Sequence, residues 1–194
     1  MHILAKVPET VPPAGSNIRH MQPGASGTSG EAIDQARRLF LDRRNIYGCA
    51  ETMFIALKAA YGLDDPADSS AAMALNGGVA YGGGPCGAIS GAALAVGLLA
   101  GRRIEDHREA KLVARELIAG LMDDFGEAYG TVDCRDLIGL DLRAPGAHRA
   151  FLRSLAWRDR CMPQLEFAIT RLAPLADQAT WDAAVARIAG PGDR

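Results

Sequence analysis

The sequence predicts an all-α fold, a compact helical bundle arranged around a central helix of small residues. No segment shows the alternation of apolar and polar residues that is typical of a half-buried strand. Several segments instead repeat apolar residues every three or four positions, and glycines, prolines or polar turns separate them. Residues 69–101 carry no charged side chain, and their second half is rich in Ala, Gly and Leu. We therefore place the central helix over residues 88–101.

The composition is that of an ordinary soluble protein. The chain has 194 residues, of which 48% are hydrophobic and 23% are charged, and its formal net charge is −2. It lacks the basic surplus of a nucleic-acid-binding protein, so no nucleic-acid partner is expected. The strongly apolar residues 88–99 are too few to cross a bilayer of about 30 Å, so no membrane insertion is expected. The first residues lack the long apolar core of a secretory signal, so we expect a cytoplasmic location.

Two regions are expected along the chain. Residues 1–28 are rich in Pro, Gly, Ser and Thr, which predicts an irregular N-terminal arm. Residues 29–190 are expected to form a single helical domain, because a chain of this length buries one sizeable core.

The first two helices are predicted before the uncharged segment. One covers residues 31–44, where apolar residues recur on one face. The other begins at Cys49 or Ala50 and ends before Gly62, which suits the position just beyond a helix. A polar loop over residues 63–70 follows.

The start of the central helix is predicted from three consecutive glycines and a proline. The glycines at 82–84 form a pliable approach, since glycine adopts positive φ without a steric penalty. Pro85 fits the first position of a helix, where its missing N–H costs nothing. Cys86 is therefore expected in the first helical turn, where free N–H groups and the positive end of the helix dipole stabilise a thiolate.

Two further elements are predicted after the central helix. Residues 102–129 form the longest amphipathic segment, with charged residues on the face opposite the apolar stripe. Asp133 is a suitable N-cap, which places Cys134 in the first turn of a short helix.

The C-terminal part is expected to hold three helices. A basic amphipathic helix covers residues 148–160 and turns Leu155 inward. Pro163 is predicted to begin the next helix, so that Cys161 lies at or near its cap. A last helix covers residues 180–189.

The cysteines share one predicted position. The chain has four of them, and each is expected to open a different helix. Helix N-termini that converge in a bundle would bring their thiolate-stabilising dipoles together. The four residues are the candidate catalytic and metal-binding residues of the chain: Cys49, Cys86, Cys134 and Cys161.

Three functions fit this pattern. Four thiolates could share a metal or an iron–sulfur cluster. Alternatively, a low-pKa cysteine, for which Cys86 is the first candidate, could attack a disulfide that a second cysteine then resolves. A helical interaction module with structural zinc or buried thiols is the third possibility, although the close Cys pairs of zinc sites are absent. No Cys-x-x-Cys-His motif occurs, so no haem is expected.

The cysteines also lie in a recognisable series of motifs. Residues 84–92 read Gly-Pro-Cys-Gly-Ala-Ile-Ser-Gly-Ala and contain a CGAxxG signature. A Cys-Ala pair precedes it at 49–50, and Phe-Gly at 125–126 and Cys-Arg-Asp-Leu at 134–137 follow it. With Cys161 as the final cysteine, the chain resembles the redox-active proteins of the C_GCAxxG_C_C family.

This resemblance spans about residues 32–173 and implies a redox function carried by the cysteines, with no defined substrate. A similar domain in split-Soret cytochrome c is associated with an iron–sulfur centre. We therefore expect the four cysteines to bind an iron–sulfur cluster for electron transfer. Gly87 and Gly91 of the signature are assigned to cofactor binding. A redox partner protein is expected, and a homo-oligomer remains open.

Overall fold

The computed structural model describes residues 28–190, and all regular elements in this part of the chain are helical. Pro85 and Asp133 form an isolated β-bridge. Together with the packing of the helices on a common core, this confirms the predicted all-α bundle. In chain order, the elements are α1 (Thr28–Phe40), α2 (Cys49–Ala60), the 3₁₀ helix η1 (Ser70–Leu75), α3 (Gly87–Arg103), α4 (His107–Tyr129), α5 (Cys134–Ile138), α6 (Ala147–Ser154), α7 (Ala156–Leu172), the 3₁₀ helix η2 (Ala173–Ala176) and α8 (Gln178–Ala189).

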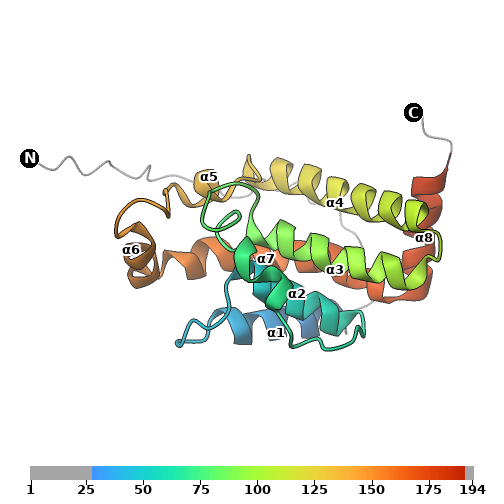
Figure 1. The fold of residues 1–194 in the computed structure, drawn as a ribbon, viewed down its shortest axis with the longest axis horizontal. Helices are drawn as coiled ribbons and strands as arrows, with labels where there is room; N and C mark the ends of the chain where they lie inside the picture. The colour runs from blue at the N-terminus through green and yellow to red at the C-terminus, as the bar shows by residue number, and fades with distance from the viewer. Residues whose placement is uncertain (1–27, 191–194) are drawn as a thin grey trace, which may run out of the picture.

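Helix α3 is the centre of the bundle, as predicted. It runs along the middle of the molecule and contacts α2, α4 and α7 (Figure 1). Its small side chains let these neighbours approach closely, because an alanine at the contact adds little bulk. Gly91 is one point of close approach, since a Cβ atom there would collide with the carbonyl oxygen of Ala50 in α2.

Helix α4 begins later than predicted. Asp106 caps it by accepting a hydrogen bond of 2.8 Å from the backbone N–H of Glu109. Gly130 ends it with a φ of +79°. Arg102 and Arg103, which the sequence assigned to this amphipathic segment, instead complete the last turn of α3.

The predicted helix over residues 148–160 is wrong, because the chain breaks at Leu155. This residue has a φ of +60°, ends α6 and caps α7. Its side chain is 48% exposed and does not point inward as predicted. Pro163 lies inside α7 and does not start a helix.

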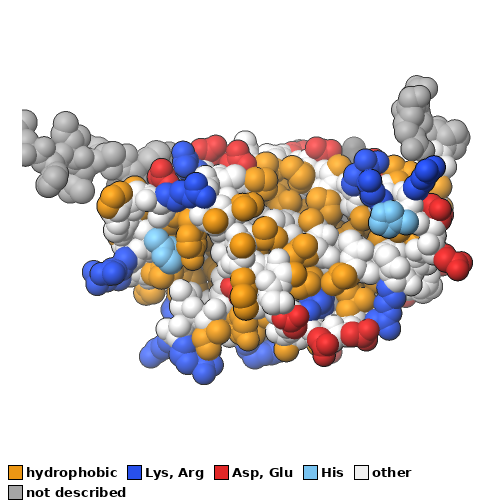
Figure 2. Space-filling view, in the orientation of Figure 1, with side chains coloured by type: hydrophobic (Ala, Val, Ile, Leu, Met, Phe, Trp, Pro, Cys, Tyr) orange, Lys and Arg blue, Asp and Glu red, His pale blue; other side chains and the backbone are white. Residues whose placement is uncertain are grey.

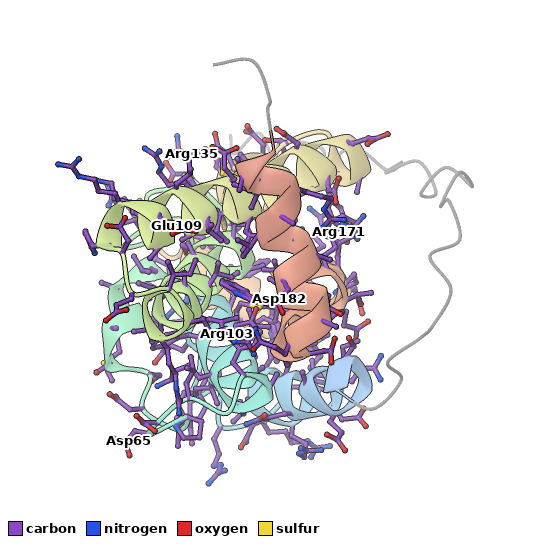
Figure 3. All side chains as sticks on the ribbon, turned by 90° about the vertical axis from the view of Figure 1, so that its right-hand side faces the viewer. Asp65, Arg103, Glu109, Arg135, Arg171 and Asp182 are labelled. Atoms are coloured by element: carbon purple, nitrogen blue, oxygen red, sulfur yellow. The ribbon has the colours of Figure 1, made fainter. Side chains whose placement is uncertain are left out.

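Arg103 fastens the far end of α3 to the C-terminal elements. Its guanidinium donates hydrogen bonds of 2.8 and 2.7 Å to the carbonyl oxygens of Leu175 and Ala176. It also lies 5.2 Å from the centre of the Trp181 ring in α8. Figure 3 shows Arg103 beside the lower part of α8, at the end of the bundle opposite α5 and α6.

Two further predictions concern the N-terminal arm and membrane insertion. The predicted irregular arm lies outside the described residues, except that its last residue, Thr28, begins α1. Within residues 28–190, no helix is both long and apolar enough to span a membrane.

Candidate functional site

Three of the four cysteines line one cavity of about 150 Å³. Cys49 is the first residue of α2, Cys134 is the first residue of α5, and Cys161 lies in the second turn of α7. The prediction that Cys161 opens a helix is therefore wrong, because α7 begins five residues earlier at Ala156. The remaining wall is mostly apolar and aromatic. Its large members are Phe40, Ile46, Tyr81, Ile138, Leu142, Phe151, Leu152 and Trp157.

Backbone hydrogen bonds place Cys86 beside Cys134. The N–H of Cys86 donates to the carbonyl of Val132 at 2.8 Å, and the N–H of Cys134 donates to the carbonyl of Gly84 at 2.7 Å. These bonds hold the starts of α3 and α5 side by side. Pro85 takes part in this pairing as a bridge residue, so it lies before the helix and not at its first position as predicted. Cys86 is consequently the N-cap of α3.

Cys86 is more deeply buried than the cysteines that line the cavity. Its side chain is 4% exposed and is not part of the cavity wall. The thiol lies 3.5 Å from the side-chain oxygen of Gln164, a buried residue of α7 one turn beyond Cys161. Cys86 therefore lies behind the cavity wall, in the protein interior, next to the segment that carries Cys134.

Gly87 brings the start of α3 against Cys49. A Cβ atom at Gly87 would collide with the Cys49 sulfur, so only glycine fits this contact. Gly91 lies one turn further along α3, against Ala50. Neither of the two glycines assigned to cofactor binding lines the cavity, and their observed contacts are with α2.

A buried polar network surrounds Cys49. The Glu51 carboxylate, 8% exposed, accepts hydrogen bonds from the N–H of Gly48 at 3.0 Å, Ser69 Oγ at 3.0 Å and Asn76 Nδ2 at 2.9 Å. Because the amide nitrogen of Asn76 faces Glu51, its oxygen faces α2 and accepts from the N–H of Ala50 at 3.0 Å. The same oxygen lies 3.9 Å from the Cys49 sulfur.

A left-handed turn forms the loop that precedes the signature. Five consecutive residues from Gly77 to Tyr81 have positive φ, although Val79, Ala80 and Tyr81 are not glycine. Each such residue costs about 1–2 kcal/mol, a strain that is commonest at functional sites. Tyr81 lines the cavity and lies 4.5 Å, ring to ring, from His148 of α6.

Burial raises the pKa of all four thiols in the metal-free protein. For Cys86 burial is the largest cause, and the neighbouring charges of the other three cysteines add to it. Burial, followed by the charge of Cys49, raises the pKa of Cys134 to about 12. Burial also raises the pKa of Cys161, with further contributions from Cys49 and Cys134. The prediction of a depressed Cys86 pKa is wrong, because desolvation of a fully buried thiolate outweighs one helix terminus.

Cys49 differs from the others in its backbone surroundings. Burial raises its pKa, but the N–H groups of Gly77, Ala50, Cys49 itself and Gly87 oppose the rise by facing the sulfur. These donors come from the left-handed turn and from the starts of two helices. Among the four cysteines, Cys49 thus combines access to the cavity with the largest set of thiolate-stabilising donors.

The described residues contain no group of three or more His, Cys, Asp or Glu side chains placed to hold a metal ion. A tetrahedral zinc site needs its sulfurs about 2.3 Å from one point. The cysteines therefore do not form a ready-made site for a single ion. They do form a sulfur-rich group around a cavity of the size that holds a benzene-sized molecule.

Sequence reasoning missed the residues that support the cysteines. Gln164, Asn76 and Glu51 lie outside the cysteine motifs, and their roles depend on contacts between distant segments. Only Glu51 had a local signal, since an acid three residues after Gly48 is typical of a capped helix start.

Comparison with known proteins places the cysteine series in a family. A family model described as "Putative redox-active protein (C_GCAxxG_C_C)" matches residues 47–173. The match covers most of the chain and includes all four cysteines. No curated protein and no solved structure matches the chain at a significant level.

Proposed function

This chain belongs to the C_GCAxxG_C_C family of redox-active proteins, and from that premise we propose that its four cysteines bind an iron–sulfur cluster for electron transfer. The observation that carries the proposal is the convergence of the cysteines. Three of them, from α2, α5 and α7, line one cavity, and the fourth is held beside Cys134 by backbone hydrogen bonds.

The donor set favours a cluster over other metal centres. Soft thiolates select Zn, Cu(I) or iron–sulfur clusters. Besides its cysteines, the cavity wall has only four polar side chains among the described residues, namely Asn45, Asn76, Tyr81 and His148. Among the described residues no three cysteines are grouped to hold one metal ion, which argues against a single zinc ion. A cluster suits them better, because its thiolate ligands bind different iron atoms and need not meet at one point.

A bound cluster would supply one-electron chemistry, and the protein would control its potential. Cys49, Cys86, Cys134 and Cys161 would hold it as thiolates. The N–H groups of Gly77 and Gly87 would donate to the Cys49 sulfur, and such donors are among the factors that set a cluster's potential. The aromatic wall, where Phe40 and Trp157 lie 5.2 Å apart edge to face, would exclude water.

Metal analysis of the full chain tests this proposal. Protein purified without oxygen, or reconstituted with iron and sulfide, should contain iron and acid-labile sulfide in equal amounts. Zinc is measured in the same samples. A protein that binds zinc tightly and takes up no labile sulfide would contradict the cluster.

A second candidate function is thiol–disulfide exchange, which the surroundings of Cys49 favour. Its thiolate would attack a substrate disulfide, forming a mixed disulfide and releasing one substrate thiolate. Cys134 or Cys161, which share its cavity, would then attack the mixed disulfide and release the second thiolate. The products are a protein disulfide and a substrate reduced by two electrons. Cys49 replaces Cys86 as the attacking residue, because Cys86 is buried and is not part of the cavity wall that a substrate would meet.

The two functions differ in what the isolated protein contains. Exchange without metal requires a colourless protein that forms one reversible disulfide including Cys49. Mass mapping of that disulfide, in protein shown to lack iron, distinguishes this function from the cluster.

A further inference from the structure

We propose that the end of the molecule around the cavity is a docking surface for an acidic redox protein. We call this surface the basic end, and define it as residues 41–48 and 133–160. The proposal rests on the proposed function in one respect, namely that the cysteines exchange electrons with a partner. Its evidence is independent of the metal and consists of charge, exposed apolar side chains and backbone strain.

The charges of the chain are divided unevenly. The basic end carries eight arginines and five aspartates. The other described residues carry ten Lys or Arg and sixteen Asp or Glu. A protein with a net charge of −2 thus presents a positive surface at the end that contains the cavity. Figure 2 shows Lys and Arg side chains at the left end, where α5 and α6 lie, around a histidine and apolar atoms.

Several of these arginines are not neutralised within the protein. Arg44 pairs with Asp42 at 2.6 Å, and Arg135 lies 3.5 Å from Asp141. The exposed Arg43, Arg149 and Arg153 form no ion pair with any described residue, so their charge faces solvent. The last two lie four residues apart on one face of α6, the helix that also provides three residues of the cavity wall. Unpaired positive charge around a redox site attracts and orients a negatively charged partner.

Apolar side chains are exposed among these charges. Ile46 is 53% exposed and Leu155 is 48% exposed, and Ile46 lines the cavity. An apolar centre within a charged rim is typical of a protein–protein interface. It is less suited to nucleic acid, whose surface offers phosphates and few apolar groups.

The backbone at Leu155 gives a separate reason to assign this surface a function. Its φ of +60° is unfavourable for a branched side chain, and glycine or asparagine would adopt it at lower cost. The leucine gives the fold only part of its possible burial in return, because the side chain is 48% exposed. Backbone strain of this kind is commonest at functional sites. We therefore assign the exposed Leu155 side chain to the surface that a partner would cover.

A binding experiment with purified probe proteins tests the proposal. The full chain, labelled with ¹⁵N, is titrated with an acidic flavodoxin and separately with a basic cytochrome c, at about 20 mM and about 200 mM salt. The acidic probe should bind, with amide shifts concentrated in the basic end, and its affinity should fall about tenfold or more at the higher salt. The basic probe should not bind there.

Charge-reversal variants identify the surface. The double variant Arg149→Glu/Arg153→Glu should lower the affinity for the acidic probe about tenfold or more. Its matched control is Arg108→Glu/Lys111→Glu, which makes the same charge change on exposed residues of α4 outside the basic end and should lower the affinity much less.

Three results would overturn the proposal: no binding of the acidic probe, equal losses in the two double variants, or tighter binding of a duplex DNA through the same arginines. Iron content does not depend on these results. A docking surface without a cluster, or a cluster without a docking surface, would therefore show which of the two proposals had failed.

Discussion

The Cys49 sulfur lies in the space that a side chain on Gly87 would need. This contact joins the start of α2 to the start of α3, and it places Cys49 against the residue that follows Cys86. The CGAxxG signature can thus be understood physically. Its cysteine, Cys86, caps α3. Its two glycines, Gly87 and Gly91, let α2 pack close to α3, and this packing holds Cys49 at the start of α3.

We predict that Gly87→Ala displaces Cys49. The added methyl group must push either the sulfur or the backbone of Ala50, so stability should fall by about 1–3 kcal/mol and iron uptake should decrease. Urea unfolding and metal analysis measure the two effects. Gly101→Ala, on the same helix with open space beside it, is the control. Equal behaviour of the two variants would show that the contact is unimportant.

A second pair of variants tests the central position of α3. Gly91→Ala should cost about 1–3 kcal/mol, because its Cβ atom would meet the carbonyl of Ala50. Gly97→Ala, two turns away with nothing within 4 Å, should instead be neutral or stabilise by up to about 1 kcal/mol through better helix propensity. Thermal melts that shift equally for both variants would contradict the observed packing.

The network at Glu51 should contribute to stability and to the position of Cys49. Glu51→Ala leaves Gly48, Ser69 and Asn76 without their acceptor and should cost about 1–3 kcal/mol. Glu109→Ala is the matched control, since Glu109 occupies the same third position in α4 but is exposed. Urea midpoints measure the difference, and a loss no larger than the control's would show that the buried network is not stabilising.

The raised thiol pKa values predict slow alkylation of the metal-free protein. With the pKa of Cys134 at about 12 against an ordinary 9.0, the folded protein holds the neutral thiol. At pH 8, iodoacetamide should modify Cys134 on the order of a hundredfold more slowly in native protein than in urea-unfolded protein. Mass spectrometry of timed samples checks this, and equal rates in the two states would contradict the buried environment.

The same pKa shift predicts that the metal-free protein becomes less stable as the pH rises into the alkaline range. Because folding raises the pKa, the thiols contribute their full stability below about pH 9 and lose it as the pH rises towards 12. Urea midpoints should therefore fall over this range, and the fall should be smaller in Cys134→Ala. A midpoint independent of pH over this range would argue against protonated buried thiols.

Local sequence patterns were enough to predict α1 to α5 and α8 in their order, but they divided the segment of α6 and α7 at the wrong residue. The starts of α2 and α5 were predicted from turn and capping residues, and the charge-free segment identified α3 as the central helix. Cys161 was misplaced because Pro163 is an ordinary sign of a helix start, whereas here it lies inside α7. The actual break, at Leu155, has no local signal, since leucine rarely adopts positive φ.

The surroundings of the cysteines could be predicted only in part. Four helix starts suggested convergence, but Asn76 and Gln164 act through contacts with segments 26 and 78 residues away. The expected low pKa of Cys86 followed from helix position alone. It failed because burial depends on the whole fold and opposes the charged form.

Single serine variants show whether all four cysteines bind one cluster. The visible absorption of the anaerobically reconstituted full chain is measured for Cys49→Ser, Cys86→Ser, Cys134→Ser and Cys161→Ser, with circular dichroism to verify that each variant folds. If each thiolate is a ligand, the unmodified protein has a strong band, and each of the four folded variants has a weakened or absent band. A folded variant that keeps the full band, or an unmodified protein that remains colourless after reconstitution, would contradict it.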